Sequence, residues 1–136
     1  MASIFSRIIA GEIPCHRVYE SALVIAFLDI APLSPGHTLV VPKRECEFLH
    51  QLDDASAAAL GEALPRVARA VLAATGATAY NLLQNNGAAA HQAVPHVHFH
   101  IIPKPNPELG LGLGWKPGTL AAADGTALAE RIRASL

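Results

Sequence analysis

The chain has 136 residues, 51% apolar and 15% charged, which predicts a single domain with a full hydrophobic core and excludes long disorder. The net charge is -1, without blocks of like charge, which argues against a nucleic acid polymer as partner. The sequence has no signal peptide pattern, no apolar run of about 18 residues and no metal-binding spacing of its 2 cysteines, so we expect a cytoplasmic protein that does not cross a membrane.

The first third of the sequence predicts a short helix followed by three strands. Apolar residues recur at helical spacing after Ser3, a good N-cap, and Gly11 suits the position just beyond the helix. Residues 16–20 and 22–29 have the pattern of strands, and the second is so apolar that both of its faces should be buried. A turn then leads to a third strand at 37–42.

The middle of the sequence predicts one long helix. Its N-cap is Asp53 or Asp54, and Gly76 ends it. Pro65 lacks a backbone donor and crowds the preceding turn, so we expect a kink there rather than two helices. The face that packs on the core is marked by apolar residues at intervals of four and three, namely Leu60, Leu64, Val67 and Val71.

The remaining sequence predicts two more strands and a tail. Residues 79–84 and 96–103 form the strands, and the loop 85–95 joins them. A segment rich in Gly and Pro, 104–118, precedes a short helix that Asp124 can cap. Strands joined mainly by short turns, with one long helix between the third and fourth, predict one α+β domain: an antiparallel five-stranded sheet with helices packed on one face.

The most unusual feature is "HVHFH" at 96–100, because alternation on a strand places its three histidines on one face. A metal site is one interpretation, but alternate residues lie about 6.6 Å apart, so one ion would need a further ligand such as His37 or His91. A second interpretation is that the three histidines form a solvent-exposed polar face of the strand. Phosphate chemistry is the third and the one we favour, because imidazole can act as a nucleophile, as a general acid or base, or as a donor to phosphate oxygens.

Four segments of the chain together resemble the histidine triad (HIT) family, most closely its branch of Hint-like nucleotidyl hydrolases. They are "IFSRIIAGEIP", "AFLDIAPLSPGHTLVVPK", "NNGAAAHQAVPHVHFHIIP" and "GLGWKPG". The resemblance covers about 3–115 and leaves 116–136 as a tail with a short helix. His100, in the third place of the triad, is similar to the hydrolase branches, since the uridylyltransferase-like branch has Gln there.

The resemblance implies a role for each histidine. His98 would attack the α-phosphorus of a nucleotide and form a covalent nucleotidyl-histidine that water then cleaves. His100 would donate to phosphate oxygens, while His37 and His96 would belong to the same network and help to set protonation.

The resemblance also implies the substrate contacts. Asp29 would hold the ribose hydroxyls, and the amides of Asn85 and Gln92 would contact the phosphate or the leaving group. Taken singly, Asp29 and Asn85 also fit turn formation, and each apolar residue fits core packing. The slot for the base would consist of Phe5, Ile8, Phe27, Ile30 and Leu39.

We therefore expect a purine nucleoside phosphoramidase or related nucleotidyl hydrolase that acts on AMP or GMP derivatives and needs no cofactor. A dinucleoside polyphosphate hydrolase, or a nucleotide-binding scaffold protein with weak hydrolysis, are the alternatives. The resemblance further implies a homodimer whose sheets join edge to edge. Trp115 would then reach the partner's site, although it could equally cover its own subunit.

Two features depart from the family pattern. His91 stands where the family usually has Gly, in the loop before the triad. Some bacterial relatives bind a structural zinc, but the corresponding positions here are Ser3, Ser6 and Glu45, so we expect no bound metal.

Overall fold

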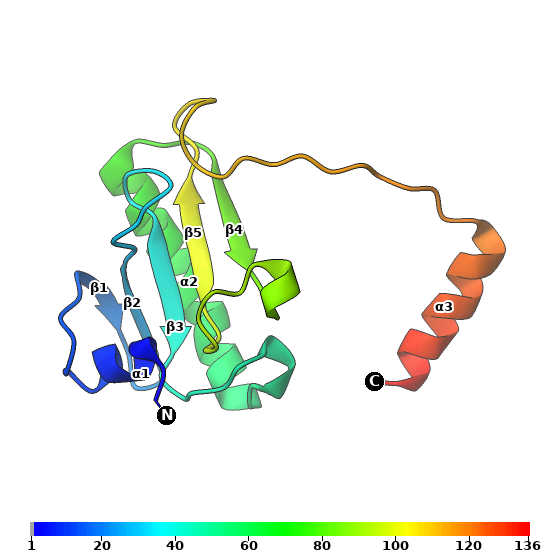
Figure 1. Cartoon of the computed structure of the whole chain (residues 1–136), viewed down its shortest axis with the longest axis horizontal. Coiled ribbons are helices and arrows are strands. Elements are labelled where there is room, and N and C mark those ends of the chain that lie inside the picture. Colours follow the sequence, from blue (N-terminus) through cyan, green and yellow to red (C-terminus); the bar gives the residue numbers. More distant parts are fainter. Residues whose placement is uncertain (1) are drawn as a thin grey trace.

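The computed structural model describes residues 2–136 and contains a five-stranded antiparallel sheet with strand order β1-β2-β3-β5-β4 (Figure 1). This agrees with the predicted α+β class. No helix in the described part of the chain combines the length and apolar character needed to cross a membrane. The elements are α1 (Ile4–Ile9), β1 (Arg17–Glu20), β2 (Val24–Leu28), β3 (Thr38–Pro42), η1 (Leu49–Gln51), α2 (Asp54–Thr75), β4 (Tyr80–Gln84), η2 (Ala88–Ala90), β5 (Phe99–Pro103) and α3 (Ala122–Ala134).

The helix ends follow their predicted caps at α1 and α2. The Ser3 side chain accepts from the backbone N–H of Ser6 at the start of α1, and Gly11 follows that helix with a φ of 81°. Asp53, rather than Asp54, caps α2, and Gly76 ends it in the left-handed conformation. α2 continues through its internal proline as a single helix, as predicted.

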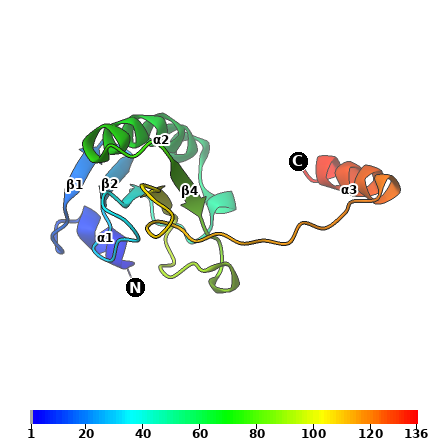
Figure 2. The same cartoon turned by 90° about the horizontal axis from the view of Figure 1, so that it is seen from above.

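The prediction that the helices pack on one face of the sheet is wrong. α2 covers one face and packs its apolar side on Val24, Val40 and Ile101. α1 lies against the opposite face, where Phe5 is buried with Phe27 and neighbouring residues of β2 and β3 (Figure 2). The reason is that β2 and β3 are apolar on both faces, so each face needs its own cover.

The strand predicted over 96–103 is shorter than expected, because the hydrogen-bonded ladder begins at Phe99. Continued pairing of β5 with β3 would place Val97 opposite Pro42, which has no backbone N–H to donate. Val97 instead donates its N–H to the carbonyl of Cys46, so 96–98 runs beside the segment that follows β3. His96 and His98 therefore precede β5, and only His100 lies within it.

The C-terminal tail leaves the body of the domain (Figures 1 and 2). Before the tail, the backbone N–H of Gly110 donates to the carbonyl of Leu33, and the chain that follows is extended until α3, which has no buried residue. The prediction that Asp124 caps this helix is wrong: the N-cap is Ala121. Asp124 lies in the first turn, where a carboxylate still favours the positive end of the helix dipole.

Candidate active site

A cavity of about 270 Å³ opens on the face of the sheet that carries α1, and two histidines of the triad line it. His98 is only 5% exposed, and its ring centroid lies 4.9 Å from that of His100. The histidines are therefore not a solvated polar face, which excludes that interpretation. A second cavity of about 310 Å³, between α2 and the edge of the sheet, has no histidine, cysteine or carboxylate in its lining. The chemistry thus belongs to the first cavity.

The tautomer of His98 follows from its hydrogen bond. Nδ1 lies 2.7 Å from the carbonyl oxygen of His96, and because a carbonyl can only accept, Nδ1 carries the proton. The neutral ring then has its lone pair on Nε2, which has no hydrogen-bond partner within residues 2–136. His98 therefore presents an unprotonated nitrogen at the cavity, as a nucleophile requires.

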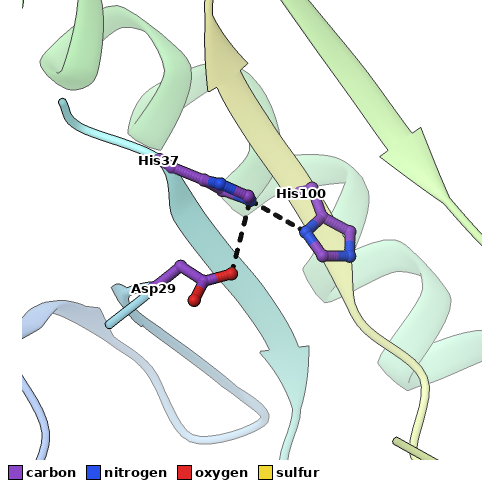
Figure 3. Close-up of side chains that lie close together, drawn as sticks. All are labelled: Asp29, His37 and His100. Atoms are coloured by element: carbon purple, nitrogen blue, oxygen red, sulfur yellow. Dashed lines mark hydrogen bonds and ion pairs between the residues drawn. The ribbon is translucent and has the colours of Figure 1, made fainter. Parts of the chain in front are cut away.

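His37 and His100 form a second chain of hydrogen bonds (Figure 3). This chain presents an N–H to the cavity, whereas His98 presents a lone pair. The backbone N–H of Leu33 donates to Nδ1 of His37 at 3.0 Å, so the proton of the neutral ring is on Nε2. That Nε2 donates to Nδ1 of His100 at 2.9 Å, which leaves the proton of His100 on its own Nε2. His100 is therefore a donor beside His98, suited to a phosphate oxygen.

Burial keeps these imidazoles uncharged. Desolvation lowers the pKa of His98 and of His37, and in His37 the nearby Asp29 opposes the shift. The pKa of His100 falls to about 4, first through desolvation and then because a positive charge on it would repel any charge on His98 or His37. At neutral pH the site is thus a set of neutral rings rather than a cluster of cations.

Asp29 lies at the end of β2 and also lines the cavity. Its Oδ1 accepts from the N–H of Ala31, as a turn-forming aspartate does, and its Oδ2 lies 3.5 Å from Nε2 of His37. The turn does not exclude ligand binding, because a carboxylate has further acceptor sites. Ligand atoms of Asp29, His37 and His100 lie within 4.8 Å of one another, so this group could also hold a metal ion.

The predicted apolar slot is brought together in full at the same cavity. Phe5 and Ile8 come from α1, Phe27 and Leu39 from the neighbouring strands, and Ile30 is 88% exposed at the cavity. Sequence reasoning missed several further lining residues. They carry no periodic signal, because they belong to loops that only the tertiary fold brings here: Ile13, Pro14, Cys15, Ala93 and Val94.

Asn85 and Gln92 are not among the residues that line the cavity. The side chain of Gln92 accepts from the N–H of Gly87 and donates to the carbonyl of Glu47, and that of Asn85 donates to the carbonyl of His91. In this structure the two amides therefore hold the loop before the triad. His91 itself has a φ of 67°, a left-handed conformation that glycine adopts more readily.

His96 does not line the cavity and is fully buried. Its Nε2 is 2.8 Å from the carbonyl oxygen of Pro42, and its Nδ1 is 2.7 Å from Oγ of Ser3. Ser3, Ser6 and Glu45, the three positions singled out in the sequence, thus gather around this ring.

Comparison with known proteins is consistent with this geometry. The family model described as HIT domain matches residues 10–106. The adenosine 5'-monophosphoramidase hnt1 of Schizosaccharomyces pombe is 48% identical over 136 residues, which are 100% of this chain and 99% of that protein. The adenylylsulfatase HINT3 of Arabidopsis thaliana is 43% identical over 74% of this chain and 51% of its own length. The crystal structure of a HIT family member from Bacillus subtilis is 38% identical and superposes with a TM-score of 0.96, covering 100% of this chain and 98% of that one.

Proposed function

The chain belongs to the HIT domain family, and from this premise we propose that it is a hydrolase that cleaves purine nucleoside phosphoramidates through a nucleotidyl intermediate on His98. The observation that carries the proposal is the unpartnered Nε2 of a neutral, buried imidazole at an apolar cavity, beside a ring that presents an N–H. A nucleophile and an oxyanion donor side by side fit a displacement at phosphorus.

The reaction proceeds in two displacements at the same atom. The Nε2 lone pair of His98 forms a bond to the α-phosphorus while the bond from phosphorus to the leaving nitrogen breaks, and the amine departs with a proton taken from water. The hydroxide left by that proton transfer then attacks the phosphorus, the bond to His98 breaks, and the nucleoside monophosphate is released. His100 donates its N–H to a phosphate oxygen in both steps, which stabilises the charge that develops there.

The lining of the cavity supports a purine nucleotide as substrate. The side chains around α1 and the adjoining loop are almost entirely hydrocarbon, which suits the faces of an aromatic base and offers little to its polar edge. Asp29 adds a carboxylate for the ribose hydroxyls. We therefore assign AMP and GMP derivatives as substrates, with the base recognised by its apolar area.

The leaving group is the part of the substrate that the triad does not specify. The matched proteins include both a monophosphoramidase and an adenylylsulfatase, which differ in the group lost from phosphorus. The same attack by His98 serves both. A panel of adenosine phosphoramidate, adenylyl sulfate and a diadenosine polyphosphate, compared by kcat/KM, ranks these classes for this enzyme.

The nucleophile is tested by His98→Ala, with the exposed His16→Ala as a matched control. We expect His98→Ala to lose roughly 10³- to 10⁶-fold in kcat for adenosine phosphoramidate, because the variant has no side chain that can form the bond to phosphorus in place of His98. AMP binding, measured by calorimetry, should persist in both variants, and His16→Ala should turn over like the natural chain. Substantial turnover by His98→Ala would refute the assignment.

We also propose that the enzyme acts as a homodimer. β4 is an edge strand that pairs only with β5, and Tyr80 and Leu82 are exposed on it. Trp115, just before the tail, is 81% exposed. The superposition with the Bacillus subtilis structure covers the whole chain, which supports the extended placement of the tail.

Sedimentation at micromolar concentration tests the dimer. The natural chain should sediment as a dimer, and Leu82→Glu, which places a charge on the exposed edge, should weaken it. A monomeric natural chain would contradict this proposal.

We place the dimer in the cytoplasm, and the two free thiols, Cys15 and Cys46, support a reducing compartment.

A further inference from the structure

Four residues outside the cavity form one hydrogen-bonded cluster: Ser3, Ser6, Glu45 and His96. The backbone N–H of Ser3 and the hydroxyl of Ser6 both donate to Oε1 of Glu45, at 2.6 and 2.7 Å. Oγ of Ser3 accepts from the N–H of Ser6 at 3.0 Å and lies 2.7 Å from Nδ1 of His96. One serine thus caps α1 and contacts a triad histidine.

The direction of the contact between Ser3 and His96 follows from the other side of the ring. Nε2 of His96 faces the carbonyl of Pro42, which can only accept, so Nε2 carries the proton. Burial lowers the pKa of His96, and the neutral ring therefore has its lone pair on Nδ1. Oγ of Ser3 lies 3.4 Å from Oγ of Ser6 but only 2.7 Å from Nδ1 of His96, and a lone pair can only accept, so we assign the hydroxyl proton of Ser3 to the bond with Nδ1.

The position of His96 affects His98 through the backbone carbonyl of His96. That carbonyl accepts the Nδ1–H of His98 at 2.7 Å, which is the bond that fixes the tautomer of His98. The ring of Phe5, on α1, packs edge-on against both, with its centroid 5.7 Å from that of His96 and 4.9 Å from that of His98. A displacement of His96 would therefore alter both the hydrogen bond and the packing that orient His98.

We propose that Ser3 is a positioning residue that acts through His96 to hold His98 with Nε2 unprotonated and directed at the substrate. The proposal rests on the proposed function for its kinetic consequence, but its structural consequence concerns the ring of His98 alone. Without the hydroxyl of Ser3, the buried Nδ1 of His96 has no partner, so the ring must shift or admit water. Either change weakens the hydrogen bond that selects the reactive tautomer.

The experiment compares Ser3→Ala with Ser3→Thr and with Asp53→Ala. Ser3→Thr keeps both the cap and the hydroxyl. Asp53→Ala removes the equivalent cap of α2, where Asp53 accepts from the N–H of Ser56, and touches no histidine. It is therefore matched to Ser3→Ala in the loss of a helix cap but not in the loss of the contact with His96.

We expect Ser3→Ala to lose roughly 10- to 100-fold in kcat for adenosine phosphoramidate with KM nearly unchanged, since the defect lies in the aim of the nucleophile. The acid limb of its pH profile should move to higher pH, because a shift of His96 loosens the packing around His98 and relieves the desolvation that lowers the pKa of His98. Ser3→Thr should restore kcat, and Asp53→Ala should keep kcat and the pH profile.

Nitrogen NMR of the imidazole rings gives a readout that is independent of turnover. The natural chain should show His98 with the proton on Nδ1, and Ser3→Ala should show a mixture of tautomers. If Ser3→Ala keeps the natural tautomer together with the natural kcat, the proposal is overturned. An equal loss of kcat in Asp53→Ala would also overturn it. If the natural chain hydrolyses none of the substrates but Ser3→Ala still shows the expected tautomer change, only the proposed function is refuted.

Discussion

The neutral state of His100 predicts a specific loss of stability in acid. In the unfolded chain its pKa is about 6.5, whereas in the folded chain it is about 4. Between these values the unfolded state binds the proton and the folded state does not, so stability is full above pH 6.5 and falls as the pH falls toward 4. Linkage gives a loss of about 2 kcal/mol between pH 7 and pH 5, which partial exposure of the ring reduces to about 1–2 kcal/mol.

Replacing the ring by an amide that cannot titrate removes this contribution. The free energy of unfolding should be measured by urea denaturation at pH 7 and pH 5 for the natural chain, His100→Gln and the control His16→Gln, which deletes an exposed imidazole. His100→Gln should lose about 1–2 kcal/mol less than the other two on acidification. If all three proteins lose the same free energy, then His100 is not held neutral by the fold, and the reasoning about the site is wrong.

Three further predictions concern backbone positions and base recognition. Gly36→Ala should destabilise the fold by about 2–3 kcal/mol in urea denaturation, because Gly36 has a φ of 89° and a Cβ there would lie 2.5 Å from the methyl of Thr75. Adding Thr75→Ser removes that methyl and should recover part of the loss. No recovery would contradict this steric account. Gly61→Ala should raise stability by about 0.5–1 kcal/mol in thermal unfolding, since a Cβ on that helix meets nothing within 4 Å; a lower Tm would count against it. Adenosine and guanosine phosphoramidates should differ by less than about tenfold in kcat/KM, as the apolar slot offers little to the base edge; a larger ratio would point to an unrecognised polar contact.

Local patterns in the sequence predicted most of the fold, because they act over a few residues. Ser3 and Gly76 terminate helices through hydrogen bonds and backbone conformations within one turn. The buried strand 22–29 was recognised from its nearly continuous apolar run. The position of α1 was not recognised, because the sequence does not say which face of a doubly apolar strand a short helix will cover.

The site shows the same division between local and long-range information. The resemblance predicted roles for the histidines and for the apolar slot, and the structure brings the slot, His98 and His100 to one cavity. The resemblance did not indicate that Asn85 and Gln92 would hold the loop, since an amide can bond either to the backbone of a loop or to a phosphate. The contact of Ser3 with His96 spans 93 positions, so no pattern of spacing could have indicated it.

The central claim is that His98 becomes covalently nucleotidylated during turnover. Rapid mixing with adenosine phosphoramidate, an acid-free quench and mass spectrometry of the peptide containing residues 96–100 test it most directly. We predict a transient adduct of one adenylyl group, localised to His98 by fragmentation and formed at a rate at least equal to kcat. Turnover with no adduct, or an adduct on His96 or His100, would contradict the account.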